Sequence, residues 1–378
     1  MNSRNTEKLS HPYFENLNGL RAIGALSVFV FHAFLLGHEV WGDFYDTSIF
    51  QIITKVASKG NYGVSLFFVL SGFLITYLLL NEAKQRGTIN VFSFFMRRLI
   101  RIWPVYFIVI IFGFVIFPHI PFGIQTTNSP WYYGFFLSNF EEIRNGFRDP
   151  VNFLTITWSV SIEEQFYMAW VALMALLPFM RKGKGFLPYM ILLVVGSIVF
   201  RILNYDQELT LYYHTFAVMS DLAIGGLLAY FCFHKGIQDK FSNMPGIANV
   251  FIYSIGIGAV IGARFIFPGG LIVVEKAILG LFFAYVIFDQ AFGKNSLFKV
   301  DTIPGLFKLG EISYGFYMYH CIILYYVLFV FGKLGWTAHL YNFIIYLILS
   351  LALTIVVSSL SYRFIEKPIL NLKKRFQP

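Results

Sequence analysis

Ten long apolar runs, separated by short polar stretches, follow one another along the 378 residues. Each run is close to the roughly 20 mostly apolar residues that a helix needs to cross a bilayer at about 1.5 Å per residue. Helices satisfy their own backbone hydrogen bonds, as lipid requires. The pattern predicts an all-α polytopic membrane protein of about ten transmembrane helices, at residues 17–37, 62–81, 102–123, 158–180, 186–203, 212–233, 247–267, 271–291, 311–332 and 342–362.

Lys and Arg are distributed unequally between alternate loops. With the N-terminus placed in the cytoplasm, the segments on that side hold most of the basic residues, including Arg97, Arg98, Arg101 and several in the C-terminal tail. Cytoplasmic loops carry such an excess. We therefore expect both termini to be cytoplasmic, which an even number of helices allows. No cleavable signal peptide or linker is recognisable, so residues 1–378 are expected to form a single transmembrane domain.

Composition excludes an ordinary soluble protein. Hydrophobic residues make up 57% of the chain and charged residues only 13%, whereas a soluble domain carries about 25% charged residues. The net charge is +9. We assign the excess of basic residues to loops that contact anionic lipid, and no nucleic-acid partner is expected. Cys232 and Cys321 lie in apolar runs without metal-binding or disulfide-framework spacing. Neither a metal nor a permanently bound cofactor is therefore expected.

Two ionisable residues share the first predicted helix. Arg21 and His32 are eleven residues apart, a rise of about 16 Å and close to three whole turns, so both point to one face. A charged residue at membrane depth costs at least about 2.5–3.5 kcal/mol, and histidine is suited to moving protons near neutral pH. A lone buried histidine often only packs between helices, but the face shared with Arg21 favours a catalytic role for His32.

Two adjacent carboxylates open the fourth predicted helix. Glu163 and Glu164 follow Trp158, which marks the membrane interface, by about 7–9 Å. At that depth a carboxylate could orient His32 or stabilise its imidazolium. The alternative is a glutamate that caps the helix or pairs with a nearby cation. We predict a catalytic role for one of the two, and the choice between them stays open.

The second predicted helix begins with a small-residue segment. Gly63 and Gly72 permit close contact between helices, and Ser71 can form a hydrogen bond across that contact. We expect a structural role for both glycines. For Ser71 the choice between a structural and a substrate-binding role stays open.

Three arginines precede the third predicted helix. Arg97 and Arg101 are i,i+4 neighbours on one helical face, and Arg98 lies between them. Guanidinium groups bind phosphates through paired hydrogen bonds, whereas the simpler interpretation is a topology signal on anionic lipid. Three arginines so close together exceed what topology requires, so a phosphate site is expected as well.

The ninth predicted helix carries a histidine near mid-membrane. Tyr317 and His320 are i,i+3 and face the same way. Structural and functional roles are equally open for both residues, and we retain them as candidate substrate-binding positions.

Six short segments, in order along the whole chain, resemble the membrane-bound acyltransferase family 3. The first joins Asn18-Gly19-Leu20-Arg21-Ala22 to His32 in the first helix. The others are residues 63–75, the Arg97/Arg101 pair with Ile102-Trp103-Pro104, residues 157–167, residues 313–320 and residues 361–368.

The resemblance implies a function and several roles. The family transfers an acyl group from cytoplasmic acyl-CoA to acceptors across the membrane, often sugars of the cell envelope. It implies that His32 is the essential histidine, that Arg21 is its companion, and that Arg97 and Arg101 act at the CoA side. Some members carry an additional esterase-like domain after the helices. No such domain is recognisable in this sequence, so the chain is expected to be of the stand-alone type. The expected location is the bacterial inner membrane.

From these residues we expect an O-acyltransferase. Acyl-CoA, with acetyl as the expected acyl group, is the co-substrate, and a surface polysaccharide or its lipid-linked precursor is the acceptor. His32 would act as general base or carry the acyl group itself. The alternatives are a transporter or flippase of a lipid-linked sugar, for which broken helices or inverted repeats would be expected, and a non-catalytic scaffold, which leaves the Arg21–His32 pair without a role.

Overall fold

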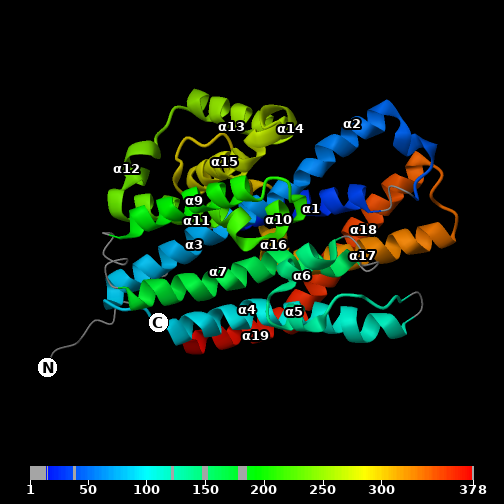
Figure 1. The fold of residues 1–378 in the computed structure, drawn as a ribbon, viewed down its shortest axis with the longest axis horizontal. Coiled ribbons are helices and arrows are strands. Elements are labelled where there is room, and N and C mark those ends of the chain that lie inside the picture. The colour runs from blue at the N-terminus through cyan, green and yellow to red at the C-terminus, as the bar shows by residue number, and fades with distance from the viewer. Residues whose placement is uncertain are drawn as a thin grey trace.

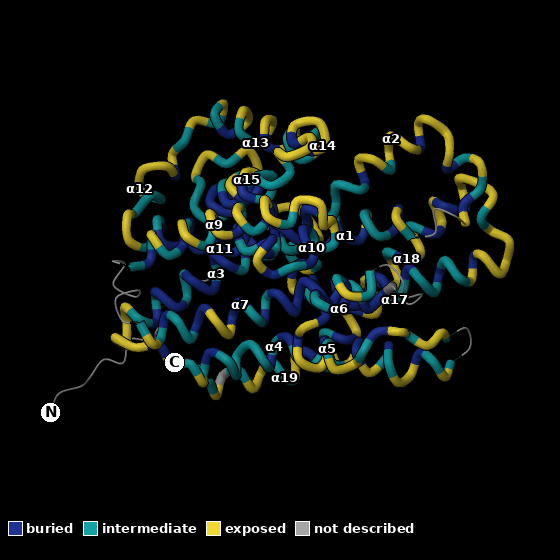
Figure 2. Tube along the Cα trace, viewed as in Figure 1, coloured by how far each residue is buried: buried dark blue, intermediate teal, exposed yellow. Residues whose placement is uncertain are grey.

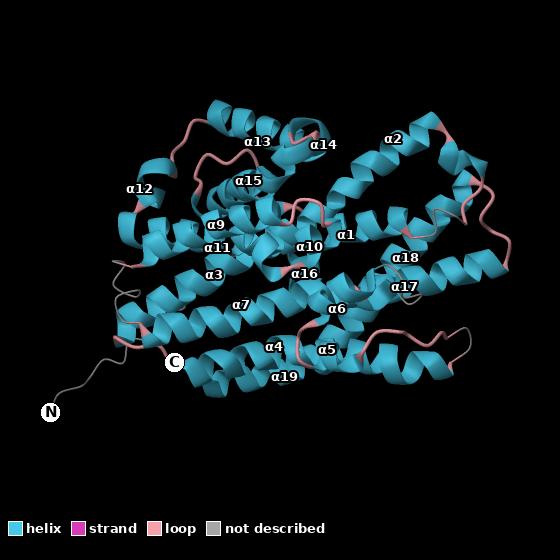
Figure 3. Ribbon diagram, viewed as in Figure 1, coloured by secondary structure: helices cyan, strands magenta, loops and turns pink. Residues whose placement is uncertain are grey.

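The computed structural model describes residues 14, 16–36, 40–120, 123–146, 152–177 and 185–376. Within these ranges the regular structure is entirely helical, without a strand (Figure 3). The fold class is therefore all-α, as predicted. Most of the N-terminal polar stretch, Arg148, the basic loop at 181–184 and the predicted helix ends at 37, 121–122 and 178–180 fall outside the described residues.

Ten helices correspond to the ten predicted segments. They are α1 (Asn16–Leu35), α3 (Tyr62–Arg86), α4 (Val91–Ile111), α7 (Thr157–Leu176), α9 (Phe186–Leu203), α11 (Thr215–Lys235), α13 (Gly246–Ile261), α15 (Ile272–Phe292), α17 (Ser313–Lys333) and α18 (Leu340–Ser361). Shorter helices join them: α2 (Ser48–Ala57), α5 (Pro130–Gly134), α6 (Ser138–Asn145), α10 (Glu208–Tyr213), α12 (Ile237–Phe241), α14 (Ala263–Ile266), α16 (Leu306–Glu311) and α19 (Lys367–Asn371).

Eight helical segments of the described chain are long and apolar enough to cross a membrane. The two predicted spans outside this set are α13, which has 16 residues, and α7, whose first half carries Glu163, Glu164 and Gln165. A multi-pass membrane protein is therefore confirmed, with eight such segments instead of ten.

The third predicted helix begins much earlier than expected. The prediction began at residue 102, whereas α4 begins at Val91 and continues through a π-helical turn at Phe112–Ile116. Asn90 caps its start by accepting a hydrogen bond from the backbone N–H of Ser93 at 2.9 Å. The three arginines therefore lie on a helix and not in the loop before it, which fixes the directions of their side chains.

Helices α3 and α11 pack against each other more extensively than any other pair of elements in the described structure. A Cβ at Gly72 would lie 2.0 Å from the carbonyl oxygen of Leu222, and one at Gly225 would lie 2.0 Å from that of Val69. Gly63 is equally confined, because its Cβ would lie 2.6 Å from the carbonyl oxygen of Gly24 on α1. The predicted structural role of Gly63 and Gly72 is confirmed, since only glycine permits backbones this close.

The helices run mostly along the long axis of the molecule, and their ends gather in two groups (Figure 1). The end of α3, the start of α4, the end of α7 and α12 lie at one end, on the left. The loop between α17 and α18 lies at the other. The segments of the first group, which the sequence assigns to the cytoplasmic side, therefore lie at one end of the bundle. Which face of the membrane that end occupies stays a prediction.

Buried side chains fill the middle of the bundle, while α2, α13 and the outer face of α18 are largely exposed (Figure 2). Ile344, Ile348 and Val356 of α18 are among the exposed apolar residues. Apolar side chains on an outer face are what lipid would cover.

Two cations link α15 to neighbouring helices, the buried Arg201 and the half-buried Lys276. Arg201, near the end of α9, donates hydrogen bonds to the backbone carbonyls of Leu211, Ala217, Ile272 and Val273. Lys276 of α15 donates to Ser65 of α3 at 2.9 Å. Its charge acts on the buried carboxylate of Asp221 in α11.

Candidate functional site

One pocket opens between five helices, α1, α3, α4, α7 and α17. These helices carry the segments that the sequence singled out. Seven of its lining residues are polar or charged and can hold a ligand: Arg21, Ser71, Arg98, Arg101, Ser159, Glu163 and Ser313. Three tyrosines, Tyr167, Tyr314 and Tyr317, also line it. The structure therefore brings together Arg21, Ser71, Arg101, Glu163 and Tyr317, which the sequence analysis singled out from separate motifs.

The positive end of the pocket is formed by Arg21, Arg98 and Arg101. Arg21 donates to Asn18 at 2.7 Å. Neither Arg98 nor Arg101 forms a hydrogen bond or ion pair with a described residue. Guanidinium groups left without an acidic partner in a pocket suit an anionic ligand, especially a phosphate.

Arg97 does not line the pocket. Its guanidinium forms an ion pair with the buried Glu82 at 3.2 Å and donates to the backbone carbonyl of Phe376 at 2.8 Å. Glu82 also accepts from the backbone N–H of Asn90. The sequence paired Arg97 with Arg101, whereas the residue beside Arg101 in the pocket is Arg98. Arg98 and Arg101 are spaced i,i+3, which also places two residues on one helical face, so the sequence allowed this pairing as well.

A lysine from the end of the chain joins this basic cluster. Residues Leu372–Phe376 form a short helical turn that packs on α4. Burial lowers the pKa of Lys373 to about 7, and the positive charges of Arg101, Arg98, Arg97 and Arg21 contribute to the shift. Lys373 thus lies among four arginines, and a bound anion would partly neutralise the positive charge of this cluster.

Glu163 occupies the middle of the pocket, where it is held by two hydroxyls. Ser71 donates to one of its oxygens and Tyr167 to the other, both at 2.7 Å. The Arg98 guanidinium lies 5.2 Å from the centre of the Tyr167 ring. Glu164 is buried on another face of α7, 3.5 Å from the Trp103 indole nitrogen. Of the two glutamates, Glu163 is therefore the one that faces the pocket.

His32 lies next to His320, although 288 residues separate them. His32 Nδ1 is 3.1 Å from His320 Nε2 and 3.0 Å from the carbonyl oxygen of Val28. The expected carboxylate partner is absent, because neither Glu163 nor Glu164 forms a hydrogen bond with His32 in the described structure. His320 takes that position.

The hydrogen bonds define the tautomers of the two histidines. His320 Nδ1 lies 2.5 Å from the carbonyl oxygen of Tyr317. A carbonyl only accepts, so this nitrogen carries the proton, and His320 Nε2 is left as an acceptor. His32 Nδ1 then donates to the Val28 carbonyl and to His320 Nε2. The lone pair of neutral His32 is consequently on Nε2, which has no partner among the described residues.

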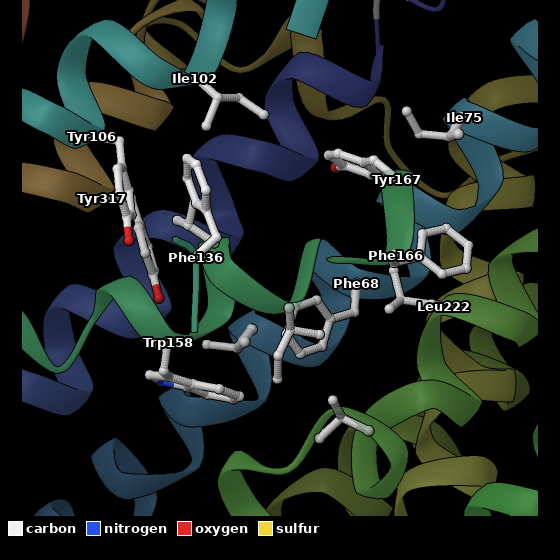
Figure 4. Close-up of a cluster of buried hydrophobic side chains, with 14 of the residues drawn as sticks. Phe68, Ile75, Ile102, Tyr106, Phe136, Trp158, Phe166, Tyr167, Leu222 and Tyr317 are labelled. Atoms are coloured by element: carbon white, nitrogen blue, oxygen red, sulfur yellow. The ribbon is translucent and has the colours of Figure 1, made fainter. Parts of the chain in front are cut away.

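Tyr317 connects the pocket to the histidine pair. It lines the pocket, and its ring centroid lies 5.7 Å from that of His320. Its hydroxyl is 2.7 Å from Ser159 Oγ and donates to the carbonyl of Ile156 at 3.2 Å. Tyr317 and Tyr167 lie on the two sides of a cluster of buried aromatic and aliphatic side chains (Figure 4). His32 and His320 themselves do not line the pocket.

Two further residues near the site were not singled out from the sequence. Glu366, at the end of the π-helical segment Tyr362–Glu366, is buried and acts electrostatically on Arg101. Cys321 Sγ lies 3.3 Å from His320 Nε2. The donor atoms of His32, His320 and Cys321 all lie within 4.8 Å of one another. Sequence spacing could not reveal this group, because it joins two helices distant in the chain.

Comparison with known proteins gives a consistent assignment. The acyltransferase-domain profile matches residues 14–363. The chain is 28% identical to the peptidoglycan O-acetyltransferase OatA of Listeria monocytogenes over 97% of its own length and 57% of that protein. It is 27% identical to the O-acetyltransferase OatA of Staphylococcus aureus, over 96% of the chain and 58% of that protein.

The chain thus spans less than two thirds of the length of these relatives. No solved structure matches it. The profile match extends from the start of α1 to the π-helical segment after α18, and so takes in all five helices around the pocket. The chain therefore belongs to acyltransferase family 3, a family of multi-pass membrane proteins.

Proposed function

We propose that this protein is a membrane O-acetyltransferase that moves an acetyl group from cytoplasmic acetyl-CoA to a sugar hydroxyl of a cell-envelope polysaccharide. The observation that carries the proposal is the pocket between five helices, with unpaired guanidinium groups at one end. Tyr317, which lines the pocket, connects it to the His32–His320 pair. Relatives named O-acetyltransferases support the acetyl group, and one named for peptidoglycan supports a cell-wall glycan. The bacterial inner membrane is the corresponding location.

The basic end would bind the phosphates of the donor. Arg98 and Arg101 offer guanidinium groups without protein partners, and Lys373 and Arg21 add positive charge. Charge-assisted hydrogen bonds to phosphate are stronger than neutral ones. Arg97 would act indirectly, because its bonds to Glu82 and Phe376 hold the start of α4 and the segment carrying Lys373.

The middle of the pocket would hold the pantetheine arm. Helix α1 is continuous from Asn16 to Leu35, so the rise from Arg21 to His32 is about 16 Å, of the order of that arm. The arm carries two amides that need donors and acceptors. Glu163, Ser71, Ser159 and the tyrosine hydroxyls supply them along the way. Glu163 also balances part of the arginine charge.

His32 would act as the general base. Its Nε2 lone pair takes the proton of the acceptor hydroxyl, whose oxygen forms a bond with the thioester carbonyl carbon. The carbon–sulfur bond breaks, and the CoA thiolate leaves and takes up a proton. His320 is a positioning residue, because its Nε2 accepts from His32 Nδ1 and so keeps the other nitrogen free. This follows the logic of a base oriented by a third group.

The test follows radiolabelled acetyl from acetyl-CoA into polysaccharide in sealed membrane vesicles. Wild-type protein should transfer label, while His32→Ala should lower the rate by about 100-fold or more, as loss of a general base does. His119→Ala is the matched control, since His119 is exposed and does not line the pocket. Insertion of each variant is checked by its yield in the membrane fraction.

Transfer by well-inserted His32→Ala at the wild-type rate would reject the assignment of the base. Absence of label with the wild-type protein, for acetyl-CoA and succinyl-CoA alike, would reject an acyl-CoA donor. Label that remains on the wild-type protein in place of the polysaccharide, but not on His32→Ala, would show that His32 carries the acyl group itself.

A further inference from the structure

A thiol lies directly beside the histidine pair, and the proposed transfer does not use it. Cys321 follows His320 in α17 and is buried. Its Sγ is 3.3 Å from His320 Nε2, and that nitrogen is 3.1 Å from His32 Nδ1. Two imidazoles and one thiol thus converge from α1 and α17, with all three donor atoms within 4.8 Å of one another.

The separations between these atoms suit a shared metal ion. Metal–nitrogen bonds of about 2.0–2.1 Å and a metal–sulfur bond of about 2.3 Å place neighbouring ligand atoms about 3.3–3.6 Å apart in a tetrahedral site, and somewhat further apart in a trigonal one. His320 Nε2 is 3.1 Å from His32 Nδ1 and 3.3 Å from Cys321 Sγ, so these two separations need to lengthen by only a few tenths of an ångström to admit the ion. The third separation, between His32 and Cys321, is within 4.8 Å. His320 Nε2 already points a lone pair into the group, as its hydrogen bonds require.

The charge balance selects the ion. A group buried between helices disfavours net charge. One thiolate and two neutral imidazoles leave Zn²⁺ with a net charge of +1, whereas they neutralise Cu⁺ completely. Thiolate and imidazole ligands both suit Cu⁺, and no fourth donor of the His, Cys, Asp or Glu type belongs to this group in the described structure.

We propose that His32, His320 and Cys321 form a Cu⁺ site whose occupation stops acetyl transfer. Binding forms one copper–sulfur and two copper–nitrogen bonds and releases the thiol proton of Cys321. With copper on Nδ1, neutral His32 must carry its proton on Nε2, so the base has no lone pair left for the acceptor hydroxyl. No electron is transferred. The inhibition, though not the binding, rests on the proposed function.

Binding is tested on the full-length protein purified in detergent, without oxygen and with excess ascorbate to keep copper reduced. Bicinchoninate, whose Cu⁺ complex is coloured, serves as the competing chelator. The wild-type protein should withdraw one Cu⁺ per chain. Cys321→Ala should weaken that affinity by at least about 10-fold, because loss of even an outer-shell partner of a metal ligand typically costs that much. Cys232→Ala is the matched control, because Cys232 is also buried but lies on α11.

Acetyl transfer is then measured with and without Cu⁺. Cys321→Ala should keep the basal rate and lose at least about 10-fold of its sensitivity to Cu⁺, and Cys232→Ala should be inhibited like wild type. X-ray absorption at the copper edge should show three ligands, one of them sulfur.

The other possible results would each overturn one part of the proposal. Equal Cu⁺ affinity of wild type and Cys321→Ala would overturn the site. Binding of Zn²⁺ but not of Cu⁺ would overturn the choice of ion, and full activity of the copper-loaded protein would overturn the inhibition. Cu⁺ binding that depends on Cys321, in a protein that transfers no acetyl group, would support the site and reject the proposed function instead.

Discussion

Arg97 and Arg98 are neighbours in the sequence but have different partners in the structure. Arg97 is bound to Glu82 and Phe376, whereas Arg98 faces the pocket without an acidic partner. The sequence identified a basic cluster and the phosphate-binding chemistry of its guanidinium groups. It could not assign a partner to each arginine, because Glu82, which binds Arg97, lies on another helix, α3.

This difference gives a prediction for the donor site. Arg98→Gln should raise the KM for acetyl-CoA about 10- to 150-fold, because a hydrogen bond to a charged group contributes about 1.5–3 kcal/mol. Arg97→Gln should instead lower thermal stability, since it leaves the buried Glu82 carboxylate without its cation. Steady-state kinetics and thermal unfolding in detergent separate the two effects. Equal increases in KM for both variants would contradict the placement.

Lys373 predicts a pH dependence of donor binding. Its pKa of about 7 is below the usual value for lysine, near 10.4. Between these values the folded chain binds fewer protons than the unfolded chain, so this group makes folding stability rise with pH in that window. A bound phosphate favours the protonated amine. Binding should therefore take up a proton, and acetyl-CoA affinity should fall as pH rises above 7.

Calorimetry in buffers with different heats of ionisation measures that uptake. Lys373→Met should abolish the proton uptake above pH 7, while Lys367→Met, at an exposed lysine, should leave it unchanged. An uptake that persists in Lys373→Met would assign the proton to another group.

Among the elements, the contact between α3 and α11 was only half visible in the sequence. Gly72 signalled a close helix neighbour, and the structure confirms one, but glycine spacing does not say which helix that neighbour is. Its identity depends on the backbone of Leu222, some 150 residues further along the chain. Hydropathy located ten helices because it reports which segments avoid water. It does not report which helix packs against which, so it left their pairing open.

The contact is confined enough to predict a loss of stability. Gly72→Ala would place a Cβ 2.0 Å from the Leu222 carbonyl oxygen, so the helices must separate, at a cost of about 1–3 kcal/mol or more. Gly196→Ala, on α9 with no atom within 4 Å of the new carbon, is the matched control. Unfolding in detergent micelles compares them. A Gly72→Ala protein as stable as Gly196→Ala would show that the two backbones are further apart.

For the whole molecule, the sequence predicted the fold class and most helix boundaries, because lipid imposes a length and a polarity on every span. It gave His32 and His320 separate roles, whereas the structure places their rings side by side. A pairing across 288 residues follows from how α1 packs on α17. No local pattern contains that information.

Orientation is the prediction that belongs to this scale. The arginine end of the pocket should face the cytoplasm, where the proposed donor is. Single cysteines at Arg86 and Lys333, both exposed, would be introduced into a chain with Cys232→Ala and Cys321→Ala. A membrane-impermeant maleimide added to intact cells should label Lys333→Cys and not Arg86→Cys. The opposite labelling would reverse the orientation and remove the donor from the basic end.

Arg201 has a consequence for how the chain is made. Its guanidinium bonds reach Val273, which is synthesised 72 residues later, a delay of roughly 4–14 seconds at about 5–20 residues per second. Until α15 emerges from the ribosome, α9 carries into the bilayer a cation with only part of its final partners. The half-made protein must therefore leave this charge in water or beside the insertion machinery. Lasting membrane integration of α9 is, in this sense, a late event that awaits α15.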